Sequence, residues 1–136
     1  MSENYKISSF RVLKAEFNIV GIDDMRENAD KEGIILKLDE KMTGRTPKNP
    51  SDKMLQLELE TTITSDEAPE LKIYLLSQSV FSYEDNSTTT TEDILQNECY
   101  PIAKSKVFDS IKIITGAMGI SPLDLNPQPP EEQKAD

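Results

Sequence analysis

The sequence predicts an α+β fold, in which a four-stranded antiparallel meander sheet carries one long C-terminal helix packed on one face. Four stretches of the chain show strand-like apolar patterning, and polar or proline-containing turns separate them. After residue 100 the apolar residues recur every three or four positions, which is the period of a helix. Strands followed by a helix are typical of α+β proteins.

The first strand is expected over residues 8–20. Its apolar alternation changes phase between Val12 and Leu13, which indicates either a bulge or burial on both faces. Residues 21–33 are polar and acidic, so we expect a loop there.

Three further strands follow. Ile34, Leu36 and Leu38 are in phase in the second strand. Residues 54–64 alternate most clearly, which indicates a sheet with one face open to water. Residues 71–83 form the fourth strand, and the short turns between the strands favour antiparallel pairing.

A short helix is expected through Ile94 and Leu95, and a long helix after it. Pro101 suits the first turn of the long helix, and Gly119 is a suitable C-cap. The long helix carries one apolar stripe, formed by Ala103, Val107, Ile111, Ile114 and Met118.

Composition bounds the class of protein. The chain has 136 residues and a net charge of −10, which disfavours binding to nucleic acid or to anionic membranes. No apolar run approaches the length of a membrane span and no signal sequence opens the chain, so the cytoplasm is the expected location. We expect one domain over residues 1–127, followed by a disordered, proline-rich acidic tail over residues 128–136.

The chain offers little for catalysis. It has no histidine, one cysteine (Cys99) and no glycine-rich phosphate loop, so we expect no enzyme activity, no cofactor and no metal site. The acids between residues 23 and 32 do not follow a calcium-loop spacing. Glu58 and Glu60 point to the same face of a strand, and the water-facing side of a sheet explains them more simply than acid–base chemistry.

Several motifs resemble the SecB protein-export chaperone family over residues 5–127. The entry to the long helix and the segment after it carry the resemblance, together with the fourth-strand sequence LLSQSVFSYED. The matching residues are Cys99, Tyr100 and Pro101, then Pro122, Leu123, Leu125 and Pro127.

The resemblance implies a chaperone that holds unfolded polypeptides in apolar grooves without ATP. Leu123 and Leu125 would line such a groove, with ordinary core as the alternative role. Leu36, Leu38 and Phe81 are weaker candidates for its floor, because ordinary core packing is the favoured interpretation of these strand residues.

The resemblance also implies a homo-oligomer, either a dimer or a tetramer. Subunits would pair through sheet edges, and the helical stripe from Ala103 to Met118 would form an interface between dimers. The alternative is that the stripe packs only on its own sheet.

Three departures from the family pattern bear on the lid of the client groove and on docking to the SecA motor, which stays open. The sequence after residue 127 is too short and too rich in proline for the family's second helix, and this tail does not resemble the family's tail. Tyr74 stands where a docking glutamate is expected, so Glu58 and Glu60 are the substitute docking candidates. The sequence therefore predicts an ATP-independent holdase, with a dedicated-client chaperone (for example of an antitoxin) or a non-enzymatic adaptor as alternatives.

Overall fold

The computed structural model describes residues 5–27, 34–49, 53–83 and 91–126. It divides into two compact units, which we call the sheet unit (residues 1–104) and the C-terminal unit (residues 105–136). The expected tail over residues 128–136 lies outside the described residues.

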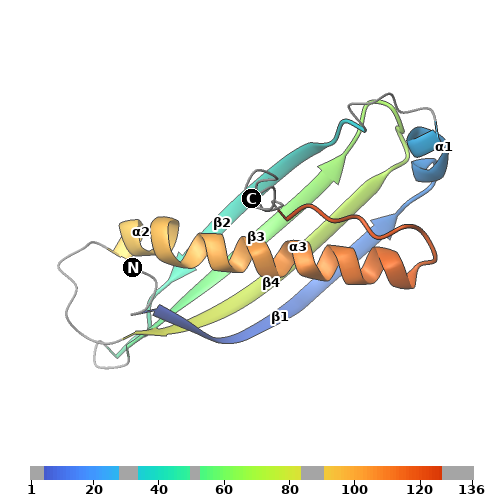
Figure 1. Ribbon diagram of the computed structural model, residues 1–136. Coiled ribbons are helices and arrows are strands. Elements are labelled where there is room, and N and C mark those ends of the chain that lie inside the picture. Colours follow the sequence, from blue (N-terminus) through green and yellow to red (C-terminus); the bar gives the residue numbers. More distant parts are fainter. Residues whose placement is uncertain (1–4, 28–33, 50–52, 84–90, 127–136) are drawn as a thin grey trace, which may run out of the picture. The chain divides into compact units, whose positions relative to one another are not determined.

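The sheet unit is built on four antiparallel strands (Figure 1), and the long C-terminal helix follows them in the chain, which confirms the predicted fold class. The strands are β1 (Tyr5–Asn18), β2 (Lys37–Arg45), β3 (Met54–Thr64) and β4 (Lys72–Tyr83). Their order across the sheet is β1-β4-β3-β2. Only β2, β3 and β4 therefore form a meander, and β1 lies beside β4 instead of beside β2.

The connection from β1 to β2 was expected to be a loop, and this is wrong over part of its length. It contains helix α1 (Ile22–Glu27), in which Ile22 and Met25 are buried. These two apolar residues are three apart and lie on one side of the short helix. Burying them gives this acidic segment an apolar anchor on the sheet unit.

Strand β1 is interrupted twice in its pairing with β4. The register shifts between Ile7 and Ser9 and again between Val12 and Lys14. The second shift lies where the apolar alternation changes phase, so the bulge reading of the sequence is confirmed. Each bulge adds an unpaired residue and increases the local twist.

The central strands separate two faces of the sheet. Alternate residues of β3 and β4 are buried on one face, which we call the apolar face, and half-buried on the other, which we call the wet face. The apolar face includes Leu55, Leu57, Leu59, Ile63, Ile73, Leu75 and Phe81. The wet face includes Gln56, Glu58, Glu60, Tyr74, Gln78 and Val80.

The helical region runs without a break from α2 (Thr91–Ile94) through a π-helical turn, η2 (Leu95–Cys99), into α3 (Tyr100–Ala117). The backbone N–H of Tyr100 bonds to the carbonyl of Leu95, which is the wide i→i−5 pattern of a π-helix. Pro101 has no backbone N–H, so a regular helix would lose one hydrogen bond at this position. A widened turn before Pro101 reduces that loss. Helix α3 thus begins at Tyr100, one residue before Pro101, with which the sequence predicts the helix to begin.

Within the sheet unit, the helical entry packs against one end of the apolar face. Leu95, Cys99 and Ala103 join one buried cluster together with Leu55, Leu57, Phe81 and Ile94. Gly44 of β2 lies close to this entry, because a Cβ atom there would meet Leu95 Cδ1 at 2.3 Å. A side chain at position 44 would displace the helical entry or its leucine.

Candidate client-binding site

The segment after α3 is a candidate because it holds both leucines that the sequence singles out. The helix ends close to Gly119, which has a φ of +93° that L-residues rarely adopt. The N–H groups of Met118 and Gly119 bond to the carbonyls of Ile114 and Gly116, at 3.0 and 3.1 Å. These bonds close the last turn, and the chain then leaves the helix.

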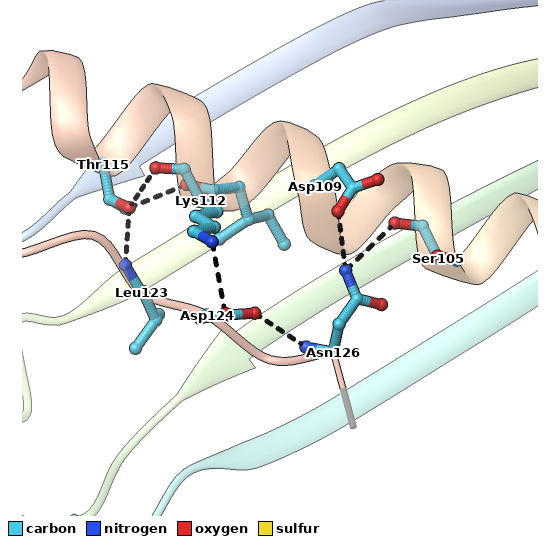
Figure 2. A network of polar contacts seen from close by, with 8 residues as sticks. Ser105, Asp109, Lys112, Thr115, Leu123, Asp124 and Asn126 are labelled. Carbon is cyan, nitrogen blue, oxygen red and sulfur yellow. Dashed lines mark hydrogen bonds and ion pairs between the residues drawn. The ribbon is translucent and has the colours of Figure 1, made fainter. Parts of the chain in front are cut away.

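The first attachment of the segment to α3 is a buried hydroxyl (Figure 2). Thr115 Oγ1 donates to the carbonyl of Ile111 at 2.7 Å and accepts a hydrogen bond of 2.9 Å from the backbone N–H of Leu123. Thr115 is fully buried. A buried N–H without a partner is costly, so this hydroxyl favours the buried position of Leu123.

Two further attachments lie toward the start of α3 (Figure 2). The ammonium of Lys112 lies 3.3 Å from a carboxylate oxygen of Asp124. The side-chain amide of Asn126 donates to the carboxylate of Asp109 at 2.7 Å and to the carbonyl of Ser105 at 3.5 Å. We call these contacts, together with the Thr115–Leu123 bond, the clasp. The clasp holds the segment antiparallel to α3 along about three helical turns.

The clasp gives the two candidate leucines different environments. Leu123 is 6% exposed, whereas Leu125 is half-buried between the two attached residues Asp124 and Asn126. Leu125 therefore keeps apolar surface exposed to solvent, and Leu123 mainly anchors the segment.

The three strand candidates also differ. Phe81 is fully buried in the cluster at the helical entry, so it has the environment of a core residue. Leu36 is half-buried in the stretch before β2, and Leu38 on β2 is 41% exposed. Of these three, Leu36 and Leu38 retain surface that another chain could contact.

The apolar stripe that was predicted as an oligomer interface is mostly buried. Ala103, Val107 and Ile111 are fully buried, while Ile114 is half-buried and Met118 is 41% exposed. The largest exposed apolar side chain of α3 is Ile113, which is 70% exposed and lies outside the stripe. An interface on this side would have to use exposed residues such as Ile113 of α3 and Met118 just after it, so the stripe as a whole stays a prediction.

The proposed docking glutamates lie on the wet face, and both have partners. Arg45 lies 3.8 Å from Glu58, and the hydroxyl of Tyr74 donates to Glu60 at 2.5 Å. This hydrogen bond raises the pKa of Tyr74, and the partial burial of the ring adds to the shift. Tyr74 stands on the fourth strand where the resemblance predicts a docking glutamate. It donates a hydrogen bond to Glu60, which is one of the two residues suggested to substitute for that glutamate.

A polar cluster at the helical entry was not foreseen from the sequence. The hydroxyl of Tyr100 donates to the carboxylate of Glu40 on β2, and Lys104 lies 3.7 Å from the same carboxylate. Burial and the contact with Glu40 both raise the pKa of Tyr100. The cluster attaches the first turn of α3 to β2, and only the pairing of a strand with a distant helix reveals it.

Neither a thiol site nor a metal site emerges from the described residues. Cys99 is fully buried, and its burial raises the thiol pKa to about 11, so the thiol is protonated at neutral pH. No group of three or more ligating side chains that could hold a metal ion occurs in residues 5–27, 34–49, 53–83 and 91–126. Among the same residues, no helix combines the length and apolar character that crossing a membrane requires.

Sequence comparisons identify no relative. No protein-family model matches the chain. No curated protein matches it either.

Solved structures do match. The SecB-like chaperone Rv1957 of Mycobacterium tuberculosis, solved in complex with a ChAD peptide from the Rv1956 HigA1 antitoxin, aligns with a TM-score of 0.63 and 13% identity over 94% of this chain and 92% of that chain. A protein of unknown function from Streptococcus agalactiae aligns with a TM-score of 0.48 and 12% identity over 90% of this chain and 96% of that one. The likeness to Rv1957 bears on architecture, and it shows that this chain has a SecB-like fold.

Proposed function

We propose that this protein is a chaperone that binds a non-native polypeptide client without ATP, and that it serves one dedicated client. The observation that carries the proposal is the likeness of the whole fold to Rv1957, a SecB-like chaperone solved with a peptide from an antitoxin. A dedicated client is favoured over a general export stream for the same reason. An adaptor that binds a folded partner is the alternative.

The surfaces around Leu125 and Leu38 suit an extended client. Both side chains keep part of their apolar surface in contact with water, which burial against a client would remove. The clasp holds the backbone N–H of Leu123 and the side chain of Asn126, on either side of Leu125, so little ordering would be needed when a client binds. Within the C-terminal unit, Leu123 would anchor the surface around Leu125. Within the sheet unit, Leu36 would extend the surface around Leu38, and Phe81 would belong to the core.

The remaining features of the proposal follow from the same resemblance. The domain would extend over residues 1–127, act in the cytoplasm and assemble into a homo-oligomer. Glu58 and Glu60 would be the docking residues if a SecA-type motor takes part, and their contacts with Arg45 and Tyr74 would then have to open. The absence of histidine in the chain supports a non-enzymatic role.

Binding of a permanently unfolded protein tests the proposal. Reduced, carboxymethylated α-lactalbumin with a fluorescent label is the probe, and anisotropy without nucleotide is the measurement. We expect Leu125→Asp to weaken binding about tenfold, because burying part of a leucine contributes about 1.5 kcal/mol. Val20→Asp is the matched control, since Val20 is 55% exposed in the sheet unit and outside the proposed surface.

The outcomes separate the alternatives. Binding that Leu125→Asp weakens and Val20→Asp does not supports a client surface at the clasp. Binding that neither variant changes places the client elsewhere. A protein that ignores unfolded α-lactalbumin but stabilises one labile partner encoded beside it would serve a dedicated client, and one that binds only a folded partner would be an adaptor.

A further inference from the structure

The two edge strands of the sheet are not equivalent. Strand β1 is broken by two register shifts, after Ile7 and after Val12. Strand β2 pairs with β3 over nine consecutive residues, Lys37 to Arg45, with no shift. Bulges blunt an edge against further pairing, whereas a regular edge presents an even row of backbone N–H and C=O groups.

The regular edge is also open. Strand β2 lies at one end of the strand order, so only β3 pairs with it in the described sheet. All of its residues except Glu40 and Met42 are exposed. At about 3.4 Å per residue, nine residues offer an edge about 30 Å long.

The side chains of β2 define what could pair with it. On the wet face Lys37, Lys41 and Arg45 alternate with Asp39 and Thr43, so cations outnumber acids three to one. Lys37 already makes an ion pair with Asp66 at 3.1 Å in which both side chains are largely exposed, so it exchanges at little cost. Arg45 makes a longer ion pair of 3.8 Å with the more buried Glu58.

The other face of β2 is partly apolar. Leu38 and Met42 lie on this face opposite Ile63 and Leu59 of β3, and Leu38 is 41% exposed. A strand added beside β2 would place apolar residues next to these side chains. Its alternate residues would lie beside the cations of the wet face.

We infer that an extended client segment adds to the edge of β2 as a fifth strand, and that this segment alternates apolar and acidic residues. The inference rests on the proposed function and specifies how the client is held. Backbone hydrogen bonds to β2 supply affinity that is independent of sequence, and the side-chain pattern supplies selectivity. The excess of cations on the wet face of β2, in a chain of net charge −10, is what selects an acidic segment.

Short peptides test the edge directly. The probe is a nine-residue peptide of alternating valine and glutamate, acetylated and amidated, with a valine–lysine peptide for comparison. Two further versions carry N-methyl groups on all valine amides or on all glutamate amides. One of these two removes the donors that face β2, so we expect one of them to bind at least about tenfold more weakly.

Charge reversal on the protein provides the second arm. Lys41→Glu should weaken binding of the glutamate peptide about fivefold, as expected for a cross-strand charge pair, and should strengthen binding of the lysine peptide. Lys6→Glu is the matched control, because Lys6 is exposed on β1 and its reversal changes the net charge equally. Hydrogen exchange should slow at those amides of residues 38–43 that do not bond to β3, and should stay unchanged in β1.

The results distinguish this inference from the proposed function. If unfolded α-lactalbumin binds, but the methylated peptides bind like the parent and Lys41→Glu behaves like Lys6→Glu, the fifth strand is wrong and the chaperone role stands. If neither α-lactalbumin nor any peptide binds, and no labile partner encoded nearby is stabilised, both are wrong. Protection of β2 that appears without peptide and grows with protein concentration would assign the edge to a second copy of the chain and overturn the inference.

Discussion

The side-chain amide of Asn126 donates a 2.7 Å hydrogen bond to the carboxylate of Asp109, seventeen residues earlier in the chain. Together with the Thr115–Leu123 and Lys112–Asp124 contacts, this bond holds the segment after α3 against the side of the helix. Leu125 lies next to Asn126, so its position depends on how well the clasp holds. The clasp therefore links helix sequence to the proposed client surface.

Loss of the buried hydroxyl should destabilise the protein. Thr115→Val keeps the shape of the side chain but leaves the N–H of Leu123 without its partner, which costs about 1–3 kcal/mol in free energy of unfolding. Urea denaturation followed by circular dichroism measures this change. Thr115→Ser keeps the hydroxyl and should lose less, so equal losses in both variants would contradict this role of the hydrogen bond.

Charge repulsion at Asn126 should open the outer end of the clasp while leaving the fold intact. Asn126→Asp places a second carboxylate beside Asp109 and removes the amide donor. We expect faster hydrogen exchange at residues 124–126 and a change in free energy of unfolding below about 1 kcal/mol, because the site is at the surface. Asp109→Asn in the same chain removes the repulsion and should slow exchange again.

The close approach of β2 to the helical entry should make Gly44 intolerant of a side chain. Gly44→Ala brings a Cβ atom to 2.3 Å from Leu95 Cδ1, so Leu95 must change rotamer inside its buried cluster. Overpacking of this kind costs about 1–3 kcal/mol of stability, measured by thermal or urea unfolding. Thr43→Ala on the opposite face is the control and should cost less.

A double variant checks the cause of the Gly44 effect. Leu95→Ala alone should destabilise by creating a cavity, but combined with Gly44→Ala the two losses should be less than additive, because the added methyl partly fills that space. Strictly additive losses would show that the two positions do not meet.

The thiol of Cys99 should be unreactive in the folded protein. It is fully buried and its pKa is raised to about 11, so Ellman's reagent at pH 8 should react slowly until denaturant is added. Because the folded pKa is raised, the stabilisation is complete below the unfolded value of 9.0 and is lost as the pH rises through about 11. Cys99→Ala should remove that part of the alkaline loss, and rapid labelling of native protein at pH 8 would contradict the burial.

Much of the fold was predictable, because β3 and β4 alternate between a buried and a wet face and their period of two is visible in sequence. The phase change at Val12 likewise signalled a bulge that the register of β1 confirms. The position of β1 beside β4 was not predictable, since alternation shows which face a residue takes and not which strand lies next to it. Helix α1 was missed because its two buried residues, Ile22 and Met25, are too few to outweigh its acids.

The candidate site was predictable only in part. The pattern of Pro122, Leu123 and Leu125 marked an apolar segment after the helix, but its attachment depends on polar side chains. Thr115 falls four residues after Ile111, in phase with the buried stripe, and a hydroxyl at a buried helical position was a signal that could have been used. The contact between Asn126 and Asp109 needs the chain to reverse, which local patterns do not encode.

Light scattering of a chemically unfolded protein diluted into buffer tests the central claim most directly. Purified chain is titrated against it without ATP. The chaperone account predicts that aggregation is suppressed near equal subunit ratios for a client that carries alternating apolar and acidic segments. No suppression of any unfolded protein by a well-folded sample, together with no stabilisation of a labile partner encoded nearby, would contradict it.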